Sequence, residues 1–106
     1  MTNRLQYLEN LLKQSPKDSF ILFALAKEYE SQGDEAQTLA FYLRLKEADA
    51  LYVGLYYHLG KCYERQHDFQ LAIETYKTGV EICKKAKDQH AMNELYGALL
   101  NLEDPE

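Results

Sequence analysis

The stretch that decides the fold is YYHLGKCYERQHD at residues 56–68, because it repeats LFALAKEYESQGD at residues 22–34. The two stretches lie 34 residues apart, and the similarity continues downstream of both. Identical residues at this offset are Leu25, Lys27, Tyr29, Glu30, Gln32, Asp34, Tyr42 and Glu47, which recur as Leu59, Lys61, Tyr63, Glu64, Gln66, Asp68, Tyr76 and Glu81. Random pairing of such a composition would give about one or two identities over this length. The repeat therefore predicts a supersecondary unit copied in tandem, which buries its core by stacking on its neighbour.

The composition is that of one folded domain. The chain has 106 residues, of which 46% are hydrophobic, and it contains only 5 Gly and 2 Pro. These values are typical of a mostly helical globular protein and not of a disordered chain. The net charge is −5, with acidic and basic residues interspersed. An acidic surface argues against general affinity for nucleic acid or for an anionic membrane.

The cysteines and the apolar segments predict a cytoplasmic protein. Cys62 and Cys83 have neither metal-ligand spacing nor the pattern of a disulfide framework, so reduced thiols are expected. The first residues lack the apolar core of a secretory signal, and no window approaches the roughly 18 apolar residues of a membrane span.

Turn and cap signals predict six helices and no strands. The expected ranges are about 3–14, 19–32, 35–48, 52–66, 69–85 and 89–102. Expected helix caps are Asp18, Asp34, Asp68 and Asp88, and Gly33 is suited to a left-handed helix end. The predicted loops have two to four residues, so successive helices should be antiparallel neighbours.

The second copy carries the pattern Tyr56-x2-Leu59-Gly60-x2-Tyr63, followed by Ala72, Tyr76 and Gly79. This pattern resembles the tetratricopeptide repeat, a helix–turn–helix of 34 residues. The corresponding residues of the first copy are Leu22, Leu25, Ala26, Tyr29, Thr38, Tyr42 and Leu45. Thr38 is the weakest match, because the motif prefers alanine there. The resemblance implies an all-α, right-handed solenoid of antiparallel helix pairs, in which small residues lie where two helices cross closely.

The same register predicts a single domain over residues 1–106. Residues 3–16 form the second half of a repeat, residues 19–52 and 53–86 form two full repeats, and residues 88–102 form a closing helix. In length and layout the chain is similar to short stand-alone tetratricopeptide proteins of bacteria.

In this family the first helix of each repeat lines a concave groove, which implies a site for a peptide segment of a protein partner. The predicted groove residues are Phe20, Phe23, Lys27, Glu30, Tyr57, His58, Lys61, Glu64 and Arg65, and Ala24 is expected on the same face. Exposed aromatic residues favour a partner surface, and the two lysines could receive an acidic group. The alternative for the lysines is neutralisation by the glutamates one helical turn away. Apart from the repeat core, Tyr7, Tyr52, Tyr57 and Tyr96 are candidate surface tyrosines.

Chemistry of its own is not expected from this chain. His58 and Cys62 lie four residues apart, but no third ligand follows at a matching interval, so we predict no metal site and no cofactor. The sequence has no glycine-rich phosphate loop and no nucleophile motif, so no catalytic residue is assigned. The leading hypothesis is a non-enzymatic interaction module or scaffold, a monomer or weak homodimer. The alternative is a self-associating structural subunit that uses its exposed first or last helix.

Overall fold

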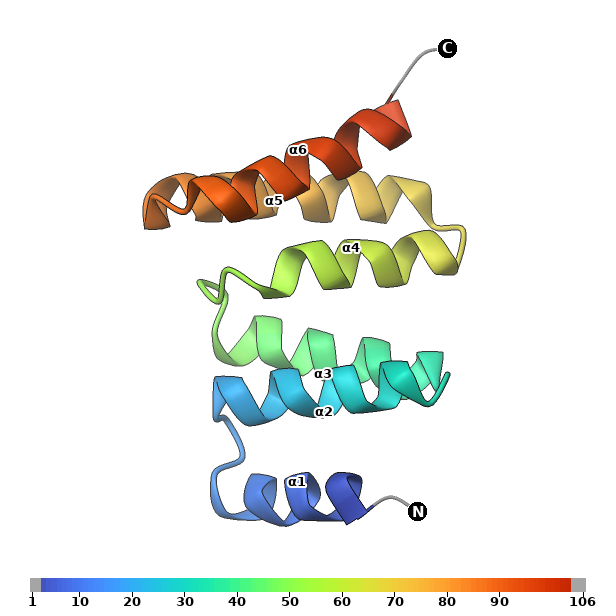
Figure 1. Cartoon of the computed structure of the whole chain (residues 1–106), viewed down its shortest axis with the longest axis vertical. Helices are drawn as coiled ribbons and strands as arrows, with labels where there is room; N and C mark the ends of the chain where they lie inside the picture. Colours follow the sequence, from blue (N-terminus) through green and yellow to red (C-terminus); the bar gives the residue numbers. More distant parts are fainter. Residues whose placement is uncertain (1–2, 104–106) are drawn as a thin grey trace. The chain divides into compact units, whose positions relative to one another are not determined.

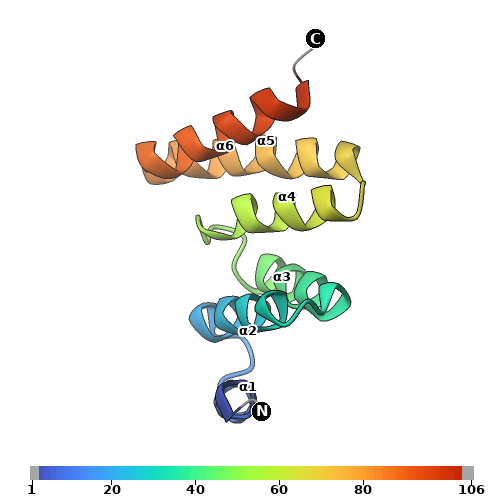
Figure 2. The same cartoon turned by 45° about the vertical axis from the view of Figure 1, so that its right-hand side comes forward.

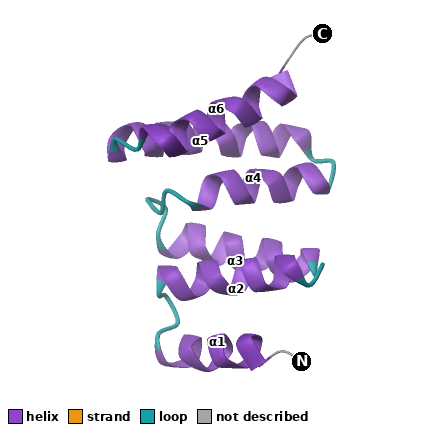
Figure 3. Cartoon of the chain, viewed as in Figure 1, coloured by secondary structure: helices purple, strands orange, loops and turns teal. Residues whose placement is uncertain are grey.

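The computed structural model describes residues 3–103, and it contains six α-helices (Figure 1). The helices are α1 (Asn3–Gln14), α2 (Ser19–Ser31), α3 (Glu35–Ala48), α4 (Leu55–Arg65), α5 (Phe69–Ala86) and α6 (Gln89–Glu103). No strand occurs within residues 3–103 (Figure 3). The predicted all-α fold of six helices is confirmed, while residues 1–2 and 104–106 of the predicted domain lie outside the described part.

The chain divides into two compact units, Met1–Tyr52 and Val53–Glu106. The first unit holds α1, α2 and α3, with α2 and α3 forming an antiparallel pair (Figure 2). The second holds α4, α5 and α6, with α4 and α5 forming the equivalent pair.

Aspartate side chains start four of the helices, as the sequence predicts. Each carboxylate accepts a hydrogen bond from a backbone N–H three residues on, at 3.0–3.3 Å: Asp18 from Ile21, Asp34 from Gln37, Asp68 from Leu71 and Asp88 from Ala91. These bonds satisfy donors that the first turn of a helix leaves without a helical partner.

The turn after α2 is left-handed at Gly33, with φ of +79°, which confirms the expected role of this glycine. The second copy places His67 at the same position, with φ of 62°. A side chain with a Cβ is strained in this region of backbone space, so repeat 2 carries a cost that repeat 1 avoids.

The predicted start of α4 at Tyr52 is wrong by three residues, since the helix begins at Leu55. Gly54 precedes it without a side-chain cap. Tyr52 stays in the preceding turn, because its N–H donates to the carbonyl of Asp49 at 3.1 Å. Its ring packs 5.4 Å from the ring of Phe23, which further fixes this residue outside the helix.

The core of each unit lies between the two helices of its repeat. In unit 2, Tyr56, Leu59 and Tyr76 are buried, and Gly60 allows α5 to cross close to α4. In unit 1, the weak match Thr38 is fully buried, and its hydroxyl donates to the carbonyl of Asp34 at 2.8 Å. Threonine is tolerated at this crossing because its polar atom is satisfied by its own helix.

Candidate partner-binding surface

The α2 face of unit 1 places an aromatic residue ahead of an ion pair. Phe23 is half-buried, with its ring 6.1 Å from Tyr42 and 5.4 Å from Tyr52. Lys27 and Glu30 follow on the same side of the helix, with 3.0 Å between Nζ and Oε1. Phe23 therefore packs within its own unit and still contributes apolar surface to this face.

The α4 face of unit 2 repeats that order. Tyr57 is half-buried with its ring 6.4 Å from Tyr76, and the Nζ atom of Lys61 lies 5.5 Å from the Tyr57 ring centroid. Lys61 Nζ is also 3.7 Å from Oε2 of Glu64. The same Glu64 oxygen accepts a hydrogen bond of 2.5 Å from the Tyr76 hydroxyl, which fixes the carboxylate in place.

Burial raises the pKa of Tyr76, and the hydrogen bond to the Glu64 carboxylate raises it further. Tyr76 therefore stays protonated and remains a donor to Glu64 well above neutral pH. Tyr76, from the second helix of the repeat, thus holds in place the carboxylate that pairs with Lys61.

The other predicted groove residues differ in their exposure. Phe20 is 70% exposed and Arg65 is exposed, as expected for a surface residue. His58 is half-buried and lies edge-on to Tyr57, with 5.6 Å between ring centroids. Ala24 was expected on the open face, but it is 8% exposed and belongs to the core. The helical spacing alone did not predict that Ala24 is buried.

Both lysines are paired with the glutamates of their own helices, which is the alternative that the sequence left open. Tyr52 was predicted from the sequence to be a surface tyrosine, but its ring packs against Phe23. Its pKa is raised by burial and by the nearby Asp49 and Asp18 carboxylates, consistent with its packed position beside Phe23. No repeated residue signals this contact, since Tyr52 lies in the turn that joins the repeats.

Within residues 3–103, no group of three or more His, Cys, Asp or Glu side chains is arranged to hold a metal ion. Cys62 and Cys83 are both buried, and neither is in a disulfide. None of the described helices is both long enough and apolar enough to span a membrane.

Comparison with known proteins agrees with this architecture. The family model for the tetratricopeptide repeat matches residues 53–85. A crystal structure of a tetratricopeptide repeat domain protein from Salinibacter ruber is 40% identical, with a TM-score of 0.79. The match covers 84% of this chain and 99% of that one. A solution NMR structure of a tetratricopeptide repeat domain protein from the same organism is 41% identical. It has a TM-score of 0.80 and covers 86% of this chain and 92% of that one.

A more distant protein from Bordetella parapertussis shares the fold, with a TM-score of 0.82 at 24% identity. That match covers 96% of this chain and 89% of the other. A search among curated proteins gave no match. The chain belongs to the tetratricopeptide repeat family. Proteins of this family are generally non-catalytic and mediate contacts between proteins.

Proposed function

We propose that this protein binds a peptide segment of a partner protein on the first-helix faces of its two repeats, the faces that line the concave groove in this family. The observation that carries the proposal is the repeated order of side chains on α2 and α4. In each unit an aromatic residue is followed by a lysine and then by a glutamate. These residues are Phe23, Lys27 and Glu30 in unit 1 and Tyr57, Lys61 and Glu64 in unit 2.

The chemistry of these faces favours a segment with one apolar anchor and one acidic group. The half-buried Phe23 and Tyr57 rings are supported from below by other tyrosines, so little conformational entropy is lost when they contact a ligand. An ammonium group can donate three hydrogen bonds. A lysine that is paired with Glu30 or Glu64 can therefore still donate a hydrogen bond to a ligand carboxylate.

The ion pairs also limit how strongly the lysines can act. The side chains of Lys27 and Lys61 are 42% and 33% exposed, so solvent screens their charges. We therefore expect the aromatic residues to supply most of the affinity and the lysines to orient the ligand and raise its association rate.

The proposal is tested by affinity capture from a lysate of the host, quantified by mass spectrometry. The test variant is Phe20→Ala/Tyr57→Ala, in which Phe20, 70% exposed and one helical turn before Phe23, replaces the packed Phe23 as the α2 target. The other baits are the wild-type protein and the control Phe69→Ala, which removes a 46% exposed ring at the start of α5. We expect a protein retained by the wild type and the control but lost with the double variant. Equal retention by all three baits would contradict the proposal.

A further inference from the structure

The last described helix carries a further copy of part of the first-helix motif. Residues 96–100 read YGALL and align with LGKCY at 59–63 and LAKEY at 25–29. In each stretch a large residue is followed directly by a small one, which is Ala26, Gly60 or Gly97. A second large residue lies three positions after the small one. On its other side, α6 buries Leu95 and Ala98 within unit 2, where it packs against α5 and α4. Thus α6 has the character of the first helix of another repeat.

In a repeat, one face of the first helix packs against the second helix. On α4 this face is covered by α5, whereas on α6 the equivalent face is open. A methyl group on Gly60 would lie 2.2 Å from the Tyr76 ring of α5. On α6, a methyl group on the equivalent Gly97 would meet nothing within 4 Å. Tyr96 is 42% exposed and Leu100 is 71% exposed. We refer to Tyr96, Gly97 and Leu100 as the open α6 face.

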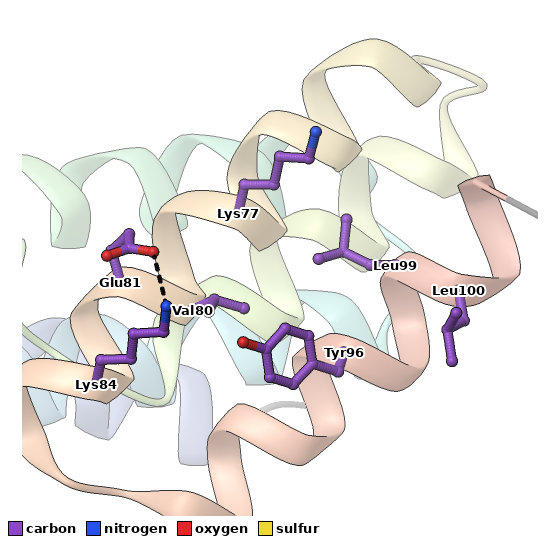
Figure 4. A pocket seen from close by; sticks show the side chains of 7 residues that line it. All are labelled: Lys77, Val80, Glu81, Lys84, Tyr96, Leu99 and Leu100. Carbon is purple, nitrogen blue, oxygen red and sulfur yellow. Dashed lines mark hydrogen bonds and ion pairs between the residues drawn. The ribbon is translucent and has the colours of Figure 1, made fainter.

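A groove of about 600 Å³ lies beside this face, between α5 and α6 (Figure 4). Its lining residues are Lys77, Val80, Glu81, Lys84, Tyr96, Leu99 and Leu100. Figure 4 shows the Tyr96 ring between the two helices and Leu100 pointing away from α5. Single exposed apolar side chains need no partner, but apolar side chains gathered beside a groove mark a place where another element can pack.

The repeat register shows what kind of element fits this groove. The α5 residues that line it have counterparts two repeat lengths upstream: Glu9, Leu12, Lys13 and Pro16. In unit 1, these four residues line a smaller cavity together with Arg44 of α3. Since α3 is the second helix of repeat 1, the groove in unit 2 lies where a second helix belongs.

The chain itself contains a helix of this type, α1, with an exposed aromatic residue at a position that second helices bury. Tyr7 of α1 lies 34 residues before Phe41 and 68 residues before Thr75, both in second helices. Phe41 is 8% exposed and Thr75 is 7% exposed, whereas Tyr7 is 62% exposed. Phe41 stacks on Tyr29 of its first helix with 5.5 Å between ring centroids. Leu8 is already buried in unit 1, but the Tyr7 ring of α1 is exposed and can make the same kind of contact.

We propose that α1 of a second copy docks on the open α6 face and supplies the second helix that completes a repeat. Tyr7 of one copy then packs on Leu100 of the other, as Phe41 packs on Tyr29. The contact is heterologous, because each copy contributes one α1 surface and one α6 surface. Assembly proceeds head to tail and uses residues outside the proposed peptide-binding faces on α2 and α4.

Sedimentation velocity and equilibrium across a concentration series test this assembly. Tyr7→Glu and Leu100→Glu each replace an apolar group of the proposed contact by a charge, and removing that charge from water opposes association. The matched control is Leu51→Glu, which changes a leucine that is 66% exposed in the turn before α4. We expect wild type and control to associate alike, and each interface variant to raise the Kd by at least about 30-fold. Circular dichroism verifies that the variants stay folded.

Mixing the two interface variants separates head-to-tail docking from other modes. The Tyr7→Glu protein keeps an intact α6 face and the Leu100→Glu protein keeps an intact α1 surface, so an equimolar mixture forms a one-to-one heterodimer. A symmetric α6–α6 or α1–α1 contact gives no such rescue and would overturn the proposal. So would a wild-type protein that stays monomeric up to about 1 mM, because the groove would then serve a different occupant.

Discussion

A Cβ atom placed on Gly60 would lie 2.2 Å from Cε1 of Tyr76, so the first and second helices of repeat 2 approach at a distance that only glycine permits. The Tyr76 ring cannot move away easily, since it is fully buried and its hydroxyl is bonded to Glu64. This contact closes the core and at the same time holds the carboxylate that pairs with Lys61 on the proposed binding face.

Gly60→Ala is therefore expected to lower the free energy of unfolding by about 1–3 kcal/mol through overpacking. Gly97→Ala is its matched control, because the added methyl group meets open space on the same kind of helix. It should raise the free energy of unfolding by up to about 1 kcal/mol, since alanine favours helix over glycine. Urea unfolding of dilute protein measures both changes, and equal effects at the two glycines would contradict the packing described.

The left-handed turn residues of the two repeats predict opposite effects. Gly33→Ala introduces a Cβ at φ of +79° and should cost about 1 kcal/mol or more. His67→Gly removes a Cβ at φ of 62° in the equivalent turn and should stabilise the protein by up to about 1 kcal/mol. Thermal and urea unfolding of the two variants provide the comparison. Destabilisation by His67→Gly would show that the imidazole makes a compensating contact, such as its edge-on packing against Phe69.

Alkaline pH is expected to unfold the protein through tyrosines that are buried or half-buried. Burial is the largest cause of the raised pKa of Tyr29, Tyr52, Tyr63 and Tyr76. In the unfolded chain tyrosine ionises near pH 10, while the folded state still holds the proton. The stability contributed by these groups is complete below about pH 10 and is lost as the pH rises further.

Absorbance of tyrosinate and circular dichroism, followed together from pH 8 to 12, test this linkage. A large part of the tyrosinate signal should appear together with loss of helix. Tyr76→Phe removes one coupled group, so the decline of unfolding free energy with pH should become shallower. An unchanged slope in that variant would contradict the assigned role of Tyr76.

The fold could be predicted from sequence because the repeat encodes it twice. Leu25 and Leu59, the small residues beside them, and the aspartate caps are local signals, and each occurs at the same place in both copies. The start of α4 could not be predicted in this way, since Tyr52 is held by Asp49 and Phe23 in a turn that has no counterpart with the same contacts. Periodicity identifies helices well, but it does not report which turn residues pack back onto a core.

The candidate site was less predictable than the fold. Helical spacing correctly placed Lys27 with Glu30 and Lys61 with Glu64, because residues three apart share one side of a helix. Spacing alone could not tell that Ala24 is buried, because burial depends on how closely neighbouring helices pack. The open α6 face also needed the structure, since the motif at 96–100 gains meaning only when Gly97 is seen to have open space above it.

The most direct test of the central claim is calorimetric titration of a captured partner against three variants at low and high salt. We expect Tyr57→Ala to weaken binding by about 10- to 100-fold at both salt concentrations, the range of a hot-spot residue. Lys61→Ala should weaken binding mainly at low salt, because added ions screen an exposed charge. Lys77→Glu, on α5 and outside the predicted faces, should leave the affinity unchanged. If Lys77→Glu abolishes binding while Tyr57→Ala and Lys61→Ala leave it intact, the α2 and α4 faces are not the partner-binding site.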